Sequence, residues 1–412
     1  MKHEELELHP HERHLLPEGQ LLYGSIVGFF YTGVAAASFV AAYLNEAGYS
    51  GTQVGSIMSV MNVLGIIASP IAGSIADRLR SPRKVLIACL ALASLLYLAA
   101  AFCGNAEVFG MPLLLLVLPL WSFFKSPLAS LTDSFAVQTA NRKGTFTFGA
   151  LRWLGSFGNA VMCIILGRIV TRTGTNICVF YLYGLINLIV IILLVMARGD
   201  DIPQEHTARK KTRNTLSLAL SSFYFKIFLV SYMLTCVPVF CLSTFLPYKL
   251  VEITGTSASF GALVAFKAFM EIPTLILGGR LMHRFGIRRT LFGAMSLFIC
   301  EQSFLFSSGV AGIAVAMCLH GISNGLFMSC ATNYIFAITP DEAKASAQTI
   351  AGALTSVASI IGSFVGGILI DKFGANGYFT FTISLVILSV LVFLVSVPLG
   401  KRLGKGEPIE NA

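Results

Sequence analysis

Charged side chains are scarce in this sequence. Asp, Glu, Lys and Arg make up 12% of its 412 residues, about half of the ~25% typical of a soluble domain. A water-soluble enzyme of this length needs more polar surface, whereas 55% apolar residues exclude a disordered chain. A transmembrane β-barrel is excluded because it shows short alternating segments, and this chain has long unbroken apolar runs. These absences leave a helical protein that crosses the membrane many times.

Motifs for catalysis and for metal binding are also missing. We find no Walker loop, metal-ligand cluster or nucleophile constellation, so ATP-driven transport and membrane enzymology lack support and no cofactor is expected. The nine cysteines are odd in number and lack CxxC spacing, which argues against disulfides and a zinc site. No apolar segment follows a basic start at the N terminus, which argues against a cleavable signal peptide.

The uncharged runs predict twelve membrane-spanning helices, each near the ~20 residues that cross a bilayer. The predicted spans are 20–45, 52–76, 85–104, 111–138, 146–170, 175–197, 217–248, 257–282, 289–308, 311–338, 345–370 and 376–398. We expect an all-α membrane protein with two six-helix bundles. The predicted divisions are a tail (1–19), a first bundle (20–197), a linker (198–216), a second bundle (217–398) and a tail (399–412).

Basic residues are distributed unevenly between the two sides of the membrane. Of the 29 Lys and Arg residues, 21 fall in the two tails and the loops on their side, four in the opposite loops and four within spans. Cytoplasmic loops are enriched in Lys and Arg, so both termini are predicted to be cytoplasmic in a multi-pass inner (plasma) membrane protein. The same asymmetry accounts for the net charge of +9 without a nucleic-acid partner.

The second half of the chain repeats a pattern of the first at a constant offset of 206 residues. The corresponding residues are Gly55, Gly73, Arg78 and Arg83 in the first copy and Gly261, Gly279, Arg284 and Arg289 in the second. A weaker echo pairs Gly155-Ser156-Phe157 with Gly362-Ser363-Phe364. Parallel repeats are related by an axis along the membrane normal and place a substrate site between the halves near the midplane. We therefore expect bundles related by a pseudo-two-fold axis.

The first copy ends in Gly73-x-x-x-Asp77-Arg78, where the glycine allows close helix packing at a helix end. This pattern resembles the loop signature of the major facilitator superfamily. The resemblance implies that fold, and it implies that Asp77 and Arg78 help latch the cytoplasmic side of the two halves. The alternative is that these basic loop residues only fix the topology.

The second copy departs from the family pattern. It keeps Gly279 and Arg284 but has His283 where the acidic residue would stand. We therefore expect a weaker latch from the second copy than from the first.

Asp133 and Arg152 are the first pair of charges expected inside the bilayer. They lie nine residues before and ten residues after Arg142, which marks the loop between two spans. At 1.5 Å per residue both are roughly 13–15 Å from that loop, so they should pair at one depth on neighbouring helices. Because a charge at mid-membrane costs about 2.5–3.5 kcal/mol, the pair is a functional candidate; a purely structural ion pair is the alternative.

The sequence around this pair resembles the lactose permease and its sugar, nucleoside and phenylpropionate symporter relatives. The resemblance covers Asp133 and the run Phe148-Gly-Ala-Leu-Arg152-Trp153-Leu-Gly155, and it implies that Asp133 and Arg152 contact the substrate. The lactose permease has a sugar-stacking Trp seven residues after the Arg, and this chain has Asn159 at that position, so the resemblance makes Asn159 a candidate substrate contact. Trp153 or a phenylalanine is then the candidate stacking group.

Lys267, Glu271 and Lys125 are further charged candidates within predicted spans. Lys267 and Glu271 form an i,i+4 pair on one helical face, just before Pro273. A substrate that competes for one partner would couple protonation to binding, so Lys267 is a substrate candidate and Glu271 a proton-coupling candidate. Lys125, eight residues before Asp133, is either an anion contact or a structural partner.

His320 lies in the predicted span 311–338 and resembles a permease segment in which a Glu three residues later carries the proton. That position is Ser323 here, so the carrier must lie elsewhere, with Glu271 first and Glu301 second. Alternatively, His320 is a satisfied core residue and Glu301 extends outward to the membrane surface.

These features predict a secondary active transporter that takes up a small polar solute with protons by alternating access. A sugar or oligosaccharide is the first expectation; the alternatives are a nucleoside or aromatic-acid proton symporter and a proton-coupled efflux antiporter. A non-transporting membrane receptor is a further alternative, but it leaves the paired charges unexplained. The expected partners are the solute, protons and the lipid bilayer, and a monomer is expected.

Overall fold

The computed structural model describes residues 20–79, 81–103, 106–108, 111–143, 148–197, 218, 220–257, 259–340 and 343–403. The predicted N-terminal tail and the predicted linker lie outside the described residues.

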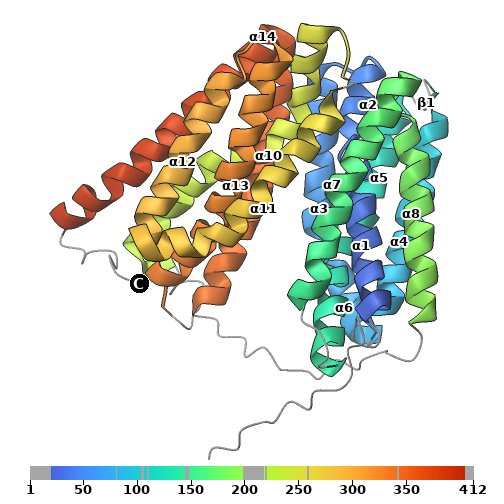
Figure 1. Cartoon of the computed structure of the whole chain (residues 1–412), viewed down its shortest axis with the longest axis horizontal. Helices are drawn as coiled ribbons and strands as arrows, with labels where there is room; N and C mark the ends of the chain where they lie inside the picture. The colour runs from blue at the N-terminus through green and yellow to red at the C-terminus, as the bar shows by residue number, and fades with distance from the viewer. Residues whose placement is uncertain are drawn as a thin grey trace, which may run out of the picture.

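The first half of the molecule is built from helices that match the first six predicted spans (Figure 1). They are α1 (Gln20–Ala37), α2 (Val40–Glu46), α3 (Gly51–Leu79), α4 (Pro82–Cys103), α5 (Leu114–Lys125), α6 (Leu128–Lys143), α7 (Phe148–Thr173) and α8 (Cys178–Met196). Two of these spans are broken, since α1 and α2 share one and α5 and α6 share another. The short strands β1 (Glu107–Val108) and β2 (Met111–Pro112) pair between α4 and α5.

The second half contains α10 (Phe223–Thr254), α11 (Phe260–Phe285), α12 (Ile287–Phe304), α13 (Val310–Ile338) and α14 (Lys344–Arg402). α14 joins two predicted spans across Gly374, whose φ of 67° lies in the left-handed region that glycine adopts readily. α11 is bent by 50° just beyond Pro273, which cannot donate a helical hydrogen bond. Every predicted span therefore overlaps a described helix.

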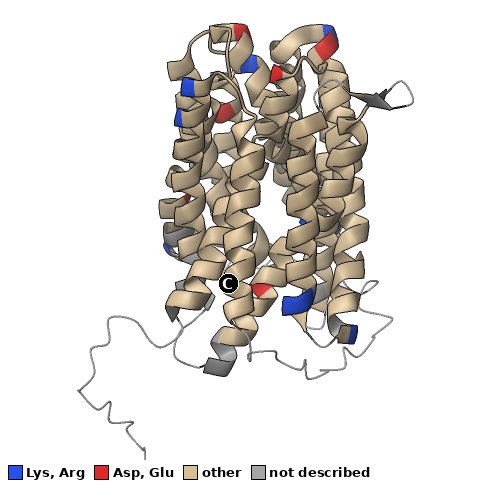
Figure 2. Ribbon diagram, turned by 90° about the vertical axis from the view of Figure 1, so that its right-hand side faces the viewer, with Lys and Arg blue, Asp and Glu red and all other residues tan. Residues whose placement is uncertain are grey.

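The surface of the bundle is apolar between two charged ends. Figure 2 shows most of the charged positions near the two ends, with a few part-way along and long uncharged stretches of helix between them. Large apolar side chains are exposed along these stretches, including Leu95 at 65%, Phe102 at 73% and Leu185 at 56%. Nine of the described helices are long and apolar enough to cross a membrane, or ten with the bent α11. The chain is a multi-pass membrane protein, and this apolar surface faces lipid.

The two halves approach each other at one end of the bundle and diverge at the other (Figure 1). We call the approaching end, where α3 begins at Gly51, the closed end. There the buried core of the first half continues into Phe245 and Phe260 of the second half. We call the other end, where α3 finishes with Arg78 and α12 begins, the basic end. A separate core fills the rest of the second half.

Candidate transport site and gate

Glycines of the internal repeat lie where the two halves touch. A Cβ atom added to Gly55 on α3 would overlap the carbonyl oxygen of Ser363 on α14. A Cβ atom added to its repeat partner Gly261 on α11 would lie 2.6 Å from the Cα of Gly167 on α7. Real Cβ atoms do not come this close to a neighbouring atom at either position. Only glycine therefore allows these helices to cross so closely. The repeat thus contributes one backbone crossing from each half to the closed end.

The packing within each half follows the same symmetry. An added Cβ at Gly155 on α7 would lie 2.7 Å from the ring of Tyr31 on α1, and one at Gly362 on α14 would lie 2.9 Å from Val237 on α10. Tyr31 and Val237 are 206 residues apart and Gly155 and Gly362 are 207 apart. Sγ of Cys241, also on α10, lies nearer still to the Cβ at Gly362, at 2.6 Å. The weaker sequence echo therefore marks equivalent helix contacts in the two halves.

Asp371 joins the halves by capping α3 at the closed end. Its two carboxylate oxygens accept hydrogen bonds from the backbone N–H groups of Gly51 (2.6 Å) and Thr52 (2.7 Å). A helix N-terminus presents such unpaired donors and carries partial positive charge. Burial raises the pKa of the Asp371 carboxyl, but hydrogen bonds from Thr52, Gly51 and Ser50 outweigh that effect and hold the pKa below its usual value.

Two more hydrogen bonds between the halves lie near this cap. The Tyr248 hydroxyl of α10 donates to the carbonyl oxygen of Tyr49 (3.1 Å). The Ser59 hydroxyl of α3 shares its one proton between the carbonyl oxygens of Gly55 on its own helix (2.8 Å) and Ile360 on α14 (2.9 Å). The sequence analysis missed Asp371, although its place at the end of the uncharged run 345–370 was a usable signal.

The Asp371→Asn variant is expected to loosen the start of α3. An amide presents one acceptor oxygen instead of two and no charge, so we expect amide exchange over residues 51–58 to become about two- to fivefold faster. Hydrogen–deuterium exchange measures this directly. Lys372→Gln, at the next exposed position, is the matched control and should leave exchange unchanged; equal acceleration in both variants would contradict a specific cap.

The pH dependence of the same exchange has a defined sign. Because the pKa of Asp371 is lowered in the folded state, its contribution is fully present above the ordinary value of about 4 and is lost as pH falls through the folded value. After correction for intrinsic exchange, protection of residues 51–58 should stay constant between pH 7 and roughly pH 5. A loss of protection that begins above pH 6 would contradict this assignment.

In the first half, a hydrogen-bonded group forms around Tyr31. The Tyr31 hydroxyl donates to Oδ1 of Asp133 on α6 (2.9 Å), and the Asn159 amide on α7 donates to the Tyr31 carbonyl oxygen (3.1 Å). Two predicted substrate residues on different helices are therefore brought together by a tyrosine that the sequence analysis missed. A neutral side chain in an apolar run gives no signal of this kind.

Arg152, the predicted partner of Asp133, has a side chain outside the described residues. The side chains of Arg152 and Trp153 lie outside the described residues, so their substrate roles stay predictions. Lys125 ends α5, where its Nζ lies 5.7 Å from the centroid of the Trp121 ring. Among the described side chains it forms neither a salt bridge nor a hydrogen bond with Asp133.

In the second half, Glu271 on α11 faces α13. The Asn324 amide donates to Oε1 of Glu271 (3.1 Å). Gly321 and Gly325 allow this approach, because a Cβ at either position would overlap α11 at Lys267 or Thr274. This small-residue spacing was overlooked in the sequence.

Lys267 is within electrostatic range of Glu271, Glu301 and, across the halves, Cys163. No salt bridge joins Lys267 to a described carboxylate. Lys267 and Glu271 therefore interact through their charges without direct contact of the charged atoms. Cys163 in turn lies 4.0 Å from the Asn159 amide oxygen. The polar groups of the two halves therefore approach each other between α7 and α11.

Glu301 and His320 form a fully buried pair. Nδ1 of His320 lies 3.0 Å from Oε1 of Glu301, and both side chains are 0% exposed. The Gln302 amide donates to the same carboxylate oxygen (3.0 Å) and accepts from Thr382 (2.7 Å). Oε2 of Glu301 and both ring nitrogens of His320 lack a described hydrogen-bond partner, so the approach of Nδ1 to Oε1 is a close contact of two titratable groups rather than an aligned hydrogen bond. The alternative that Glu301 extends to the surface is wrong, because α12 directs it into the interior.

The predicted gate glycines at the basic end, Gly73 and Gly279, are not packed against another described helix in this conformation. Among the described residues, nothing lies within 4 Å of a Cβ added at Gly73 or Gly279, so the close packing predicted for these glycines is not formed with the described helices. The side chain of Asp77 lies outside the described residues. Arg78 has no salt bridge with a described side chain, and the Arg284 guanidinium lies 5.3 Å from the Phe285 ring centroid.

Comparison with known proteins shows to which protein family the chain belongs. The model of the MFS_1 like family matches residues 22–381. The chain belongs to this family. This MFS transporter is 26% identical over 371 residues to "Maltose permease" of Geobacillus stearothermophilus, covering 89% of this chain and 91% of that one. It is 24% identical over 386 residues to "Putative nucleoside transporter YegT" of Escherichia coli (strain K12), covering 86% and 87%.

Solved structures agree with the fold. The nucleoside transporter NupG superposes with a TM-score of 0.78 at 15% identity, covering 93% of this chain and 100% of that one. The family match and the transporter relatives make the chain a membrane transporter of a small molecule rather than an enzyme, and the solved structure supports its helical fold. The resemblance inferred from the sequence is confirmed.

Proposed function

We propose that this MFS transporter takes up a small polar solute, a sugar or oligosaccharide, together with protons. The buried pair of Glu301 and His320 carries the coupling. A carboxyl and an imidazole in contact can hold one proton between them, as two ions or as two neutral groups. An unpaired charge at this place is costly, so gain or loss of a proton changes how the surrounding helices pack.

Glu301 now takes precedence over Glu271 as the proton carrier. Glu301 is 0% exposed and faces a second titratable group, whereas Glu271 is only partly buried and bonds a neutral amide. We assign Glu271 and Lys267 to the solute side of the site. Proton binding at Glu301 would then reach the solute through the electrostatic link to Lys267.

The solute class is proposed from the groups that surround the site. Asp133, Tyr31 and Asn159 present carboxylate, hydroxyl and amide groups from three helices, which suits a solute with several hydroxyl groups. The similarity to a maltose permease favours a sugar. The similarity to a putative nucleoside transporter supports a nucleoside as the second candidate.

The orientation is proposed from the basic residues. With the basic end in the cytoplasm, both termini are cytoplasmic and the closed end faces outward in a plasma membrane. This conformation is then open to the cytoplasm, and the transport cycle proceeds by parting the closed end while Gly73 and Gly279 pack at the other. We propose that the transporter works as a monomer.

A ligand screen tests the solute class. Purified transporter is heated with sugars, nucleosides and aromatic acids, and the solute at about 100 times its Kd should raise the melting temperature by roughly 4 °C. Arg152→Ala should abolish the shift, whereas Arg168→Ala, at an exposed position on the same helix, should retain it. A shift produced only by aromatic acids would contradict a polyhydroxylated solute.

Coupling is tested separately in proteoliposomes. An inward proton gradient should drive solute accumulation, and a protonophore should reduce it to simple equilibration. Equal uptake with and without the imposed gradient would reject proton coupling but leave the solute class intact.

A further inference from the structure

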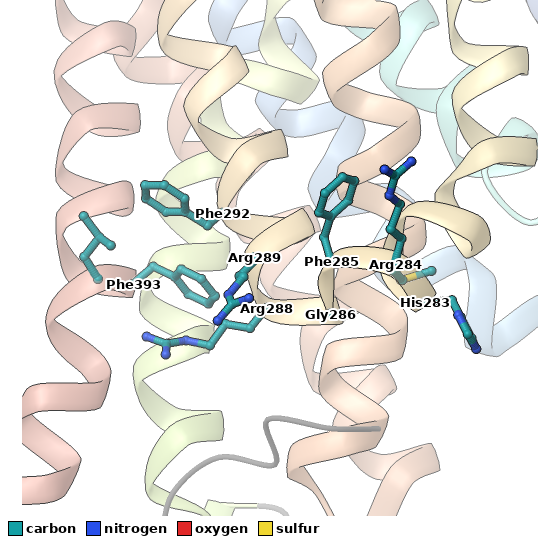
Figure 3. Close-up of a pocket in the computed structure, with 10 residues that line it drawn as sticks. His283, Arg284, Phe285, Gly286, Arg288, Arg289, Phe292 and Phe393 are labelled. Carbon is teal, nitrogen blue, oxygen red and sulfur yellow. The ribbon is translucent and has the colours of Figure 1, made fainter.

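A basic cavity lies at the turn between α11 and α12, outside the transport site. It has a volume of about 570 Å³ and is lined by ten residues of α11, α12 and α14. Figure 3 shows Arg288 and Arg289 on the side of the turn that faces Phe393, whereas His283 and Arg284 lie on the other side. Three of the ten lining residues are arginines, and none is acidic.

Two of the four basic residues lie at a helix C-terminus and two at a helix N-terminus, where a positive charge has the opposite energetic effect. His283 and Arg284 occupy the last turn of α11, where cations are favourable because a helix C-terminus is partially negative. Arg288 and Arg289 begin α12, which has no acidic residue in its first turn. There the guanidinium charges add to the partial positive charge of a helix N-terminus. The α12 side of the cavity is therefore the part that requires an anion.

The described protein does not supply that anion. Neither Arg288 nor Arg289 forms a salt bridge with a described carboxylate. Nε of Arg288 is buried without a described hydrogen-bond partner, while its guanidinium carbon lies 5.7 Å from the Phe393 ring centroid. A buried donor without an acceptor is costly, and an anion in the cavity would satisfy it.

The internal repeat provides a comparison within the same chain. Arg83, the repeat partner of Arg289, is 7% exposed and donates to the carbonyl oxygen of Leu194 (3.2 Å). Arg289 is exposed and has no such described acceptor. The position that corresponds to Arg288 is Pro82. Compared with the first half, the second half thus has an additional arginine, Arg288, and its Arg289 lacks the described backbone hydrogen bond that Arg83 forms.

The apolar part of the cavity indicates which anion fits. Phe285 is 50% exposed and Leu394 is 45% exposed, and both line the cavity on helices that cross the membrane. A free anion would use only the arginines. A phospholipid would place its phosphate at the arginines and its acyl chains along these apolar side chains, as basic pockets between membrane helices do with anionic lipids.

We propose that the cavity between α12 and α14 binds an anionic phospholipid, with its phosphate at Arg288 and Arg289. The site belongs to the basic end and is separate from the groups that surround Tyr31 and Glu271. It requires only that the chain spans a membrane, so it does not depend on the identity of the solute or on proton coupling.

The test titrates purified transporter in detergent with short-chain phosphatidylglycerol, short-chain phosphatidylcholine and inorganic phosphate, and measures the melting temperature. Phosphatidylglycerol should stabilise the wild type, and the Arg288→Gln/Arg289→Gln variant should need about ten- to thirtyfold more lipid for the same shift. The control variant Arg172→Gln/Lys372→Gln removes the same charge at exposed positions of the closed end and should behave like the wild type.

Each other outcome overturns the proposal. An equal shift with inorganic phosphate would assign the site to a free anion, and an equal shift with phosphatidylcholine would remove the need for negative charge. Equal weakening in both double variants would show general surface attraction. Arg289→Gln alone changes an exposed side chain and should fold normally; if it melts like the wild type yet binds phosphatidylglycerol unchanged, the phosphate is not at Arg289.

Discussion

Glu301→Gln is expected to give a transporter that exchanges solute but no longer accumulates it. A glutamine keeps the size of the side chain and a hydrogen-bonding oxygen near His320, but it cannot release or accept the coupled proton. At 100 mV one coupled charge supplies about 2.3 kcal/mol, so the wild type should concentrate solute more than tenfold. In the variant the inside-to-outside ratio should approach about one.

Proteoliposomes loaded with unlabelled solute measure both properties of this variant. Counterflow of labelled solute should persist, because the polar groups at Tyr31 and Glu271 are unchanged, while gradient-driven uptake should be lost. Glu252→Gln, an exposed carboxylate near Lys249, is the control and should accumulate normally. If Glu271→Gln loses accumulation while Glu301→Gln keeps it, the proton is carried on α11 and our assignment to Glu301 is wrong.

Gly261→Leu is expected to prevent closure of the closed end. The added side chain would meet the backbone of Gly167 at 2.6 Å, and a backbone atom cannot move aside as a flexible side chain can. Overpacking of this kind costs about 1–3 kcal/mol, which is enough to shift the population of the closed conformation about five- to 150-fold. Transport should fall by about five- to 150-fold as well, since the cycle passes through this conformation.

Cys163 reports the opening directly. Its side chain is 1% exposed in this conformation, and its backbone lies against Gly261. Alkylation of Cys163, followed by peptide mass spectrometry, should be slow in the wild type and at least tenfold faster in Gly261→Leu. Gly293→Leu, at an exposed position where an added Cβ atom meets no described atom within 4 Å, should leave the alkylation rate unchanged.

The sequence predicted the membrane spans well because the bilayer imposes one strong rule. A long run without charge crosses the bilayer as a helix, and the polar residues lie in the turns between helices. The predicted span 311–338 accordingly matches α13 at Val310–Ile338. The internal repeat also identified Gly55 and Gly261, but it did not indicate their function. Their role depends on which helices of the two halves cross, and that information lies in the three-dimensional arrangement.

The sequence predicted Glu301 and His320 as separate residues rather than as a pair. Glu301 and His320 were both selected because charge and imidazole are rare in apolar helices. Their contact depends on how α12 and α13 are rotated about their axes, which spacing along one chain does not determine. Tyr31 was not predicted, because a tyrosine in an apolar run is usually a packing residue and its neutral side chain gives no sign of a site.

The glycine crossings at Gly55 and Gly261 have a thermodynamic consequence for the transport cycle. Glycine has no side-chain rotamers to immobilise, so bringing the halves together at these two crossings orders no side chain of the glycines themselves. Parting them leaves no buried charge behind, because both contacts are made by backbone atoms. The two conformations can therefore lie close in free energy, and a ligand shifts such an equilibrium by its differential affinity for the two states. A proton and a solute molecule, each with modest preference, are then sufficient to set the direction of the cycle.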